Sequence, residues 1–163
     1  MKKREAEILL EQFVDIHGTN KGSADLHVMI EWLFRDLNTA GLLIKQSPDQ
    51  SPQGYQFMIT LALRYLLGEN LSIVDITPVQ VVPVMETGAK GTVFDLGETG
   101  PEGLLFCLRF LMEVVGIKKV KRCKACGRII FAAHGRTAYC KNNDVCKNRF
   151  NYLENKKLKE VKK

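Results

Sequence analysis

Long apolar runs are missing from this sequence. Charged residues interrupt every apolar stretch within about a dozen residues, whereas a helix that spans a bilayer needs about 20. The N-terminal segment, which begins Met1-Lys2-Lys3-Arg4, is charged and has no apolar signal core. These absences argue against a membrane protein or an exported one, and they predict a cytoplasmic protein with no membrane partner.

Catalytic motifs are missing as well. The chain has 3 histidines, and neither His17 nor His27 has a partner at the spacing of a metal site or a catalytic triad. The glycine-containing segment 88–92 lacks the spacing of a phosphate-binding loop and is better read as a turn. We therefore expect that the protein is not an enzyme.

Basic residues are scarce at the start of the chain, and acidic residues are scarce at its end. Residues 1–116 contain nine Lys and Arg against fifteen Asp and Glu, a net charge of −6, whereas residues 117–163 contain fifteen against three, a net charge of +12. Hydrophobic residues make up 45% of the whole, which suits a globular protein. The asymmetry predicts two domains, a body (1–116) and a basic module (117–163), and it indicates a polyanionic partner.

The residue pattern of the body predicts four helices. Apolar residues recur at helical spacing over 4–17, after Ser23, after Ser51 and from Pro101 onward. Ser51 is a suitable N-cap because Pro52 follows it at the first helical position. The apolar set predicted for the third helix is Phe57, Met58, Leu61, Leu63, Tyr65 and Leu66.

A small sheet is predicted between the third and fourth helices. The runs 71–76, 79–84 and 92–96 are short and β-branched, and proline and glycine separate them. Pro83 places the second run at an edge, because proline has no backbone N–H to donate to a central strand. We predict a two- or three-stranded antiparallel sheet, so the fold class is α+β, with a mainly helical body.

The cysteines supply the clearest chemical signal. Four of the five lie within 24 residues of the basic module, as a C-x2-C pair and a later pair. In a reducing compartment such clustering favours a metal over disulfides, and Zn²⁺ suits four thiolates in a closed, structural site. The predicted zinc ligands are Cys123, Cys126, Cys140 and Cys146. The fifth, Cys107, lies in the fourth predicted helix and is interpreted as a small buried hydrophobe.

Two alternatives stay open for this site. His134 lies between the two pairs and is a fifth candidate ligand, although we expect it at a hairpin tip that points away from the metal. An iron–sulfur cluster would use the same thiolates. A zinc-deaminase site is excluded, because no His-x-Glu segment occurs and Arg122, rather than proline, precedes Cys123.

The residues around the cysteines predict a knuckle, a hairpin and a helix in that order. The hairpin strands are expected at 128–132 and 137–140, and the helix is expected to begin near Val145, with Cys146 in its first turn. Cys146, Phe150 and Leu153 form the inward stripe of that helix. This order is typical of a treble clef.

The module resembles the CGNR zinc-finger family. The features that carry the resemblance are Arg122-Cys123, Cys126-Gly127, Phe131, Tyr139-Cys140 and Cys146-Lys147-Asn148-Arg149, where lysine replaces the glycine of the family motif. The body is diffusely similar to the helical domain that accompanies this finger in stress-induced transcription regulators. The similarity is carried by Phe13-Val14-Asp15, Trp32-Leu33, Ala40-Gly41-Leu42-Leu43 and Leu63-Arg64-Tyr65-Leu66-Leu67. The resemblance implies a bacterial transcription regulator with a regulatory body and a nucleic-acid-binding finger.

Charge and resemblance together predict binding of nucleic acid, with DNA favoured over RNA. The candidate contacts are Lys121, Arg128, Arg136, Lys147, Asn148, Arg149 and Lys156. The alternative is a zinc-stapled protein-interaction module whose basic helix docks on an acidic protein. A homodimer and an unknown effector on the body are both compatible with the sequence.

Overall fold

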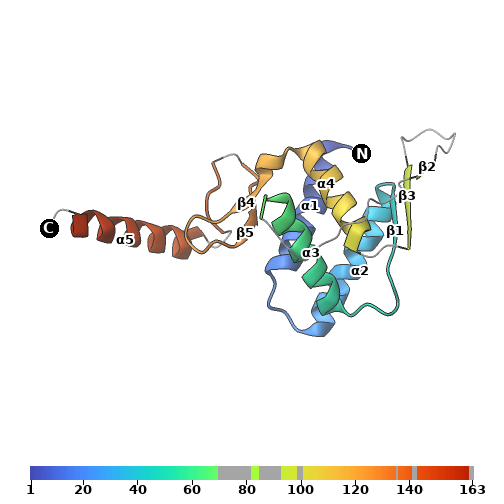
Figure 1. Ribbon diagram of the computed structural model, residues 1–163, viewed down its shortest axis with the longest axis horizontal. Coiled ribbons are helices and arrows are strands. Elements are labelled where there is room, and N and C mark those ends of the chain that lie inside the picture. The colour runs from blue at the N-terminus through green and yellow to red at the C-terminus, as the bar shows by residue number, and fades with distance from the viewer. Residues whose placement is uncertain (70–81, 85–92, 99–100, 135, 141–142, 162–163) are drawn as a thin grey trace. The chain divides into compact units, whose positions relative to one another are not determined.

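The structure, a computed structural model, describes residues 1–69, 82–84, 93–98, 101–134, 136–140 and 143–161. The chain divides into two compact units, Met1–Ile117 and Lys118–Lys163 (Figure 1). None of the helices in these described ranges is long and apolar enough to cross a membrane. The class is α+β, as predicted from the sequence.

Four helices lie in the described part of the body. They are α1 (Lys3–Gly18), α2 (Ser23–Thr39), α3 (Pro52–Leu66) and α4 (Pro101–Val115). Helix α4 packs against both α1 and α3, and α2 packs against the same two helices. Apolar side chains dominate the core between them, where Phe13, Ile30 and Leu108 have no exposed surface.

Local chemistry fixes the ends of these helices. The Ser51 hydroxyl accepts a hydrogen bond from the Gly54 N–H at 3.0 Å, which confirms the predicted cap of α3. Gly116 follows α4 with a φ of +106°, in the left-handed region where a side chain would be strained, and its N–H donates to the Met112 carbonyl at 2.8 Å. The chain therefore turns out of α4 immediately before the module.

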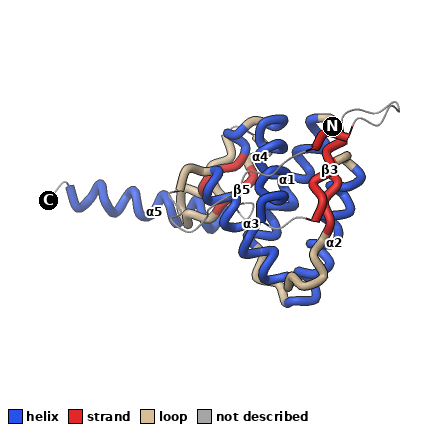
Figure 2. Tube along the Cα trace, turned by 45° about the vertical axis from the view of Figure 1, so that its right-hand side comes forward, coloured by secondary structure: helices blue, strands red, loops and turns tan. Residues whose placement is uncertain are grey.

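The described residues of the body contribute three strands to one sheet, in the order β1-β3-β2, namely β1 (Leu42–Lys45), β3 (Val93–Glu98) and β2 (Val82–Val84). The antiparallel β2–β3 pair confirms two of the predicted strands, and β2 with its Pro83 lies at an edge, as predicted. The remaining predicted run, 71–76, lies outside the described residues. Figure 2 shows the strands of this sheet side by side, and β1 packs against α2.

Strand β1 was not anticipated from the sequence. It pairs in parallel with β3, Leu42 beside Phe94, so the sheet is mixed rather than purely antiparallel. The side chains of Leu42 and Ile44 are buried, whereas those of Leu43 and Lys45 are exposed. The Asn38 side chain at the end of α2 accepts the Ile44 N–H at 2.7 Å and fixes the entry into the strand.

The inward face of α3 also differs from the prediction. Tyr55, Ile59, Ala62 and Leu63 are buried, whereas Phe57 is 63% exposed. The Tyr55 hydroxyl accepts the Ser47 N–H at 2.6 Å, and its ring meets Phe34 of α2 edge-on at 5.2 Å. Tyr55 rather than Phe57 therefore lies in the core, where its hydroxyl has a hydrogen-bond partner.

The module consists of a two-stranded antiparallel hairpin and a long helix. Strand β4 (Val120–Arg122) pairs with β5 (Ile129–Phe131), and a 3₁₀ turn (Ile117–Lys119) precedes them. The helix α5 covers Asn143–Val161. A small buried set, Val120, Ile129, Ile130 and Ala132, forms the apolar centre of the hairpin.

Candidate metal centre

The cysteine pair 123 and 126 lies in the turn that joins β4 to β5. The Cys123 N–H donates to the Arg128 carbonyl at 2.8 Å, which closes the ladder of the hairpin, and the Gly127 N–H donates back to the Cys123 carbonyl at 2.9 Å. Gly127 has a φ of +72°, in the left-handed region that favours glycine. This tight turn presents both thiols on the same side.

The second pair comes from two different elements. Cys140 ends the loop after the hairpin, and Cys146 occupies the first turn of α5. That loop is held to the knuckle because the Lys124 N–H donates to the Ala138 carbonyl at 3.0 Å. Tyr139 and Phe150, whose ring centroids are 5.8 Å apart, connect the loop to the helix.

The four sulfur atoms converge. The Sγ atoms of Cys123, Cys126, Cys140 and Cys146 all lie within 4.8 Å of one another, and those of Cys126 and Cys140 are 3.4 Å apart. Four thiolates around one Zn²⁺ at about 2.3 Å would be about 3.8 Å apart, so this spacing fits a tetrahedral site. The predicted ligands are therefore brought together in positions that can bind a metal ion.

Hydrogen bonds to sulfur prepare the site for thiolates. Desolvation raises the pKa of Cys123, but donors from the backbone of Cys126, Ala125 and Cys140 and from the Cys126 thiol outweigh it, and the pKa falls to about 6. The pKa of Cys140 is raised, first by desolvation and then by its neighbouring thiols and the Cys123 charge. Four negative sulfurs cannot coexist at this distance without a cation, which is the electrostatic role that a bound divalent metal fills.

The other candidate ligand stays apart from this cluster. His134 is exposed, its carbonyl accepts the Thr137 N–H at 2.9 Å, and the described residues hold no metal-binding cluster that includes it. Cys107 is fully buried in α4, where desolvation raises the pKa of its thiol to about 12, as expected of a cysteine used as a hydrophobe.

The predicted hairpin was wrong in its partner strand. Strand β5 pairs with β4, upstream of the knuckle, rather than with 137–140, which forms no strand. The ladder places Val120 beside Phe131 and Arg122 beside Ile129. The knuckle is consequently the turn of the hairpin, and residues 132–140 form a loop that returns to it.

Two basic side chains brace this hairpin, a role that sequence reasoning missed. The Arg122 guanidinium donates to the Gly127 carbonyl at 2.7 Å, and the Lys119 ammonium donates to the Ala133 carbonyl at 2.6 Å. The backbone donors to Cys123 were also missed, because an amide N–H has no sequence signature. The sequence signal for the turn that orients these donors is Gly127, directly after Cys126.

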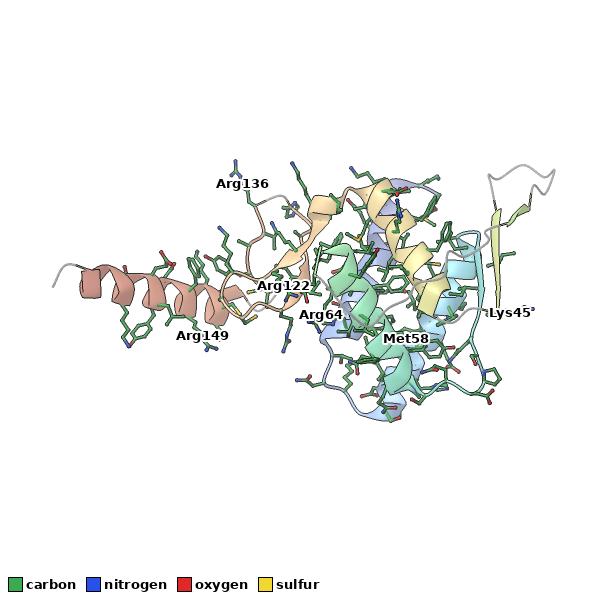
Figure 3. The ribbon with its side chains drawn as sticks, viewed as in Figure 1. Lys45, Met58, Arg64, Arg122, Arg136 and Arg149 are labelled. Atoms are coloured by element: carbon green, nitrogen blue, oxygen red, sulfur yellow. The ribbon has the colours of Figure 1, made fainter. Side chains whose placement is uncertain are left out.

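The predicted nucleic-acid contacts are distributed over the whole module. Lys121 is half-buried in β4 and has an interaction partner, whereas six of the seven predicted contacts are exposed: Arg128, Arg136, Lys147, Asn148, Arg149 and Lys156. Arg136 and Arg149 project away from the ribbon (Figure 3). The six residues do not form one compact cluster, because some lie on the hairpin side and others along α5.

Comparisons with protein-family models, with curated proteins and with solved structures found no match to this chain. What can be said of its function therefore depends on the metal centre and on the surface that this centre holds in place.

Proposed function

We propose that this protein is a zinc-containing nucleic-acid-binding protein, a transcription regulator in which a four-cysteine zinc site stabilises a basic module. The observation that carries the proposal is the coincidence of the sulfur cluster with the charge: the unit Lys118–Lys163 has a net charge of +12. A charge of that density on a fixed scaffold attracts a polyanion through the release of its counterions.

The metal assignment follows from the donor set. Four thiolates select Zn²⁺ or an iron–sulfur cluster over hard cations, and a tetrahedral site in a small module is typical of structural zinc. The described apolar centre of the module is small, so the metal would supply about 10 kcal/mol or more of its folding free energy. All four positions are occupied by protein sulfur, which gives the metal a structural role.

The resemblance to the CGNR zinc-finger family supports the same class. It rests on the residues around the cysteines, and the lysine at position 147 departs from the family motif. In that interpretation the body (Met1–Ile117) is the regulatory domain, and an effector or a second copy of the chain would act through it.

A salt-dependent binding experiment tests the proposal. The zinc-loaded chain is titrated into duplex DNA, single-stranded DNA and RNA over a series of salt concentrations. The double variant Arg136→Gln/Lys156→Gln should lower the slope of log K against log salt by about one unit per side chain that contacts a phosphate. The matched control, Lys21→Gln/Lys45→Gln, removes two exposed charges from the body and should leave the slope unchanged.

A second candidate is supported by the charge of the body. The unit Met1–Ile117 carries −6, so acidic protein surfaces are also electrostatic partners for the module. Poly-L-glutamate of matched charge distinguishes the two functions. Binding of this polymer as tight as that of DNA would favour an acidic protein partner, whereas failure of the zinc-loaded chain to bind any nucleic acid at low salt would refute the first proposal.

A further inference from the structure

The exposed side of α5 has a composition that a purely electrostatic surface would not need. Val145 is 74% exposed and Tyr152 is 68% exposed, on a helix that is polar on average. At 3.6 residues per turn, positions 145, 149, 152 and 156 lie on one face. We call Val145, Arg149, Tyr152 and Lys156 the α5 stripe, and all four of its side chains are exposed.

A different face of α5 packs onto the rest of the module. Cys146 and Phe150 are half-buried, about 100° around the helix from the stripe, and they connect α5 to the sulfur cluster and to Tyr139. Leu153, which was predicted to continue this inward face, is 42% exposed. From Asn151 to Lys156 every side chain is exposed, so no described residue covers this part of the helix.

We propose that α5 enters the major groove of duplex DNA and that three residues of the α5 stripe, Val145, Arg149 and Tyr152, contact the base edges. This inference rests on the proposed nucleic-acid-binding function and names the partner and the reading surface. A bare α-helix is about 10–12 Å across with its side chains, which matches the width of about 12 Å of the major groove of B-DNA. The stripe extends about 16 Å along the axis, the length of four to five base pairs.

The chemistry of the stripe fits that surface. Arg149, in the middle of the stripe, can donate two hydrogen bonds to a guanine, and Val145 and Tyr152 can contact thymine methyl groups. Lys156, one turn beyond Tyr152, is placed for a phosphate at the groove edge. The convergence of apolar and cationic groups on one exposed face distinguishes α5 from a helix that is merely solvated.

Single-stranded nucleic acid and duplex RNA fit the module less well. Single strands are bound on platforms of several exposed aromatic rings. Here Phe131 is half-buried, and Tyr139 and Phe150 pack against each other, so those rings are used inside the module. The major groove of duplex RNA is too deep and narrow for side chains to read. The geometry thus favours DNA, and within DNA it favours the major groove.

Groove-specific blocking tests this placement on the full, zinc-loaded chain. Two duplexes of the same mixed sequence are compared, one of which carries glucosylated 5-hydroxymethylcytosine, whose sugar fills the major groove. Binding to the modified duplex should be at least about fivefold weaker, the effect of losing one good base contact. The minor-groove ligand netropsin should leave binding to the unmodified duplex unchanged.

Substitutions on and off the stripe localise the effect. Tyr152→Ala, which changes no charge, should weaken binding to the unmodified duplex about fivefold or more. It should also reduce the groove penalty, which is the ratio of the affinities for the unmodified and the modified duplex. Asn151→Ala, the neutral exposed neighbour on the far side of α5, should do neither. Arg149→Ala should reduce the groove penalty, whereas Lys147→Ala, also on the far side, should lower only the salt slope.

The outcomes separate the two proposals. Equal binding to both duplexes, competition by netropsin, or tighter binding to single strands or RNA would overturn the major-groove inference while leaving nucleic-acid binding intact. Binding to none of these polymers would overturn both.

Discussion

The rings of Tyr139 and Phe150 meet at a centroid distance of 5.8 Å and an interplanar angle of 58°. Each ring lies next to a predicted metal ligand in the chain or one helical turn away: Tyr139 directly precedes Cys140, and Phe150 follows Cys146 by four residues. This contact between the loop and α5 therefore helps to position α5 beside the sulfur cluster, together with Cys146, which α5 contributes to that cluster.

Phe150→Ala should weaken zinc binding because it removes the ring that holds α5 against the loop. The loss of an aromatic pair and of part of its buried area corresponds to about 1–2 kcal/mol, or about tenfold in zinc affinity. Competition with a chromogenic chelator measures it. Phe57→Ala, which removes an exposed phenyl ring from the body, is the control, and an equal loss in both variants would contradict this role.

Alanine substitution of a ligand should reduce the metal content, whereas alanine at the fifth cysteine should not. Cys146→Ala and Cys123→Ala each remove one of the four converging thiols, and Cys107→Ala changes a buried residue of α4. Substitution with Co²⁺ reports the ligands directly through thiolate charge-transfer absorption. A wild-type cobalt spectrum in Cys146→Ala would remove this cysteine from the site.

Removal of the metal should unfold the module and leave the body intact. The N–H groups of Cys123, Lys124, Gly127 and Ala132 are hydrogen-bonded around the knuckle and the hairpin, so they should lose protection from hydrogen exchange when a chelator is added. The Ile44 N–H, bonded to the Asn38 side chain in the body, should keep its protection. Retained protection of the four module amides would show that the module folds without metal.

The stability of the body should fall at alkaline pH through Tyr55. Desolvation raises the pKa of this phenol above its ordinary 10.0, although its hydrogen bond with Ser47 acts in the opposite direction. Because the unfolded chain ionises first, the contribution of Tyr55 to the free energy of unfolding is complete below pH 10.0. It is lost as the pH rises through the pKa of Tyr55 in the folded state.

Tyr55→Phe supplies the comparison. At pH 8 it should cost about 1 kcal/mol, since the Ser47 N–H loses the acceptor that lies 2.6 Å away. Above pH 10 the difference between wild type and variant should shrink. Urea denaturation at pH 8 and pH 11, followed through the circular dichroism of the body, measures both values. A constant difference at the two pH values would contradict the raised pKa.

The convergence of Cys123, Cys126, Cys140 and Cys146 was predictable because cysteine chemistry leaves few choices. In a reducing compartment four thiols at this spacing commonly bind a metal ion or an iron–sulfur cluster, and Gly127 marks the turn that carries the first pair. The helices of the body were also predictable, because Ser51, Pro52 and Gly116 mark their ends locally.

What could not be predicted depends on contacts far apart in the chain. Strand β1 has only four residues, and its partner β3 lies beyond α3, so no local pattern reveals it. Strand β4 is three residues long, too short for an alternation to be read. In α3, apolar residues lie on all sides of the helix, so their periodicity does not identify the buried face. Tyr55 is buried instead of Phe57 because it contacts Phe34 of α2 and hydrogen-bonds to Ser47.

The parallel pairing of β1 with β3 also sets the order of events during synthesis. Helices form within microseconds, but Leu42 must wait for Phe94, which the ribosome adds about 3–10 s later at 5–20 residues per second. Helix α4, which packs against α1 and α3, comes later still. The body is thus completed only as the first residues of the module follow it. For these seconds the backbone of Leu42–Lys45 lacks its partner β3 in every nascent chain, and chaperone binding would have its largest effect in this period.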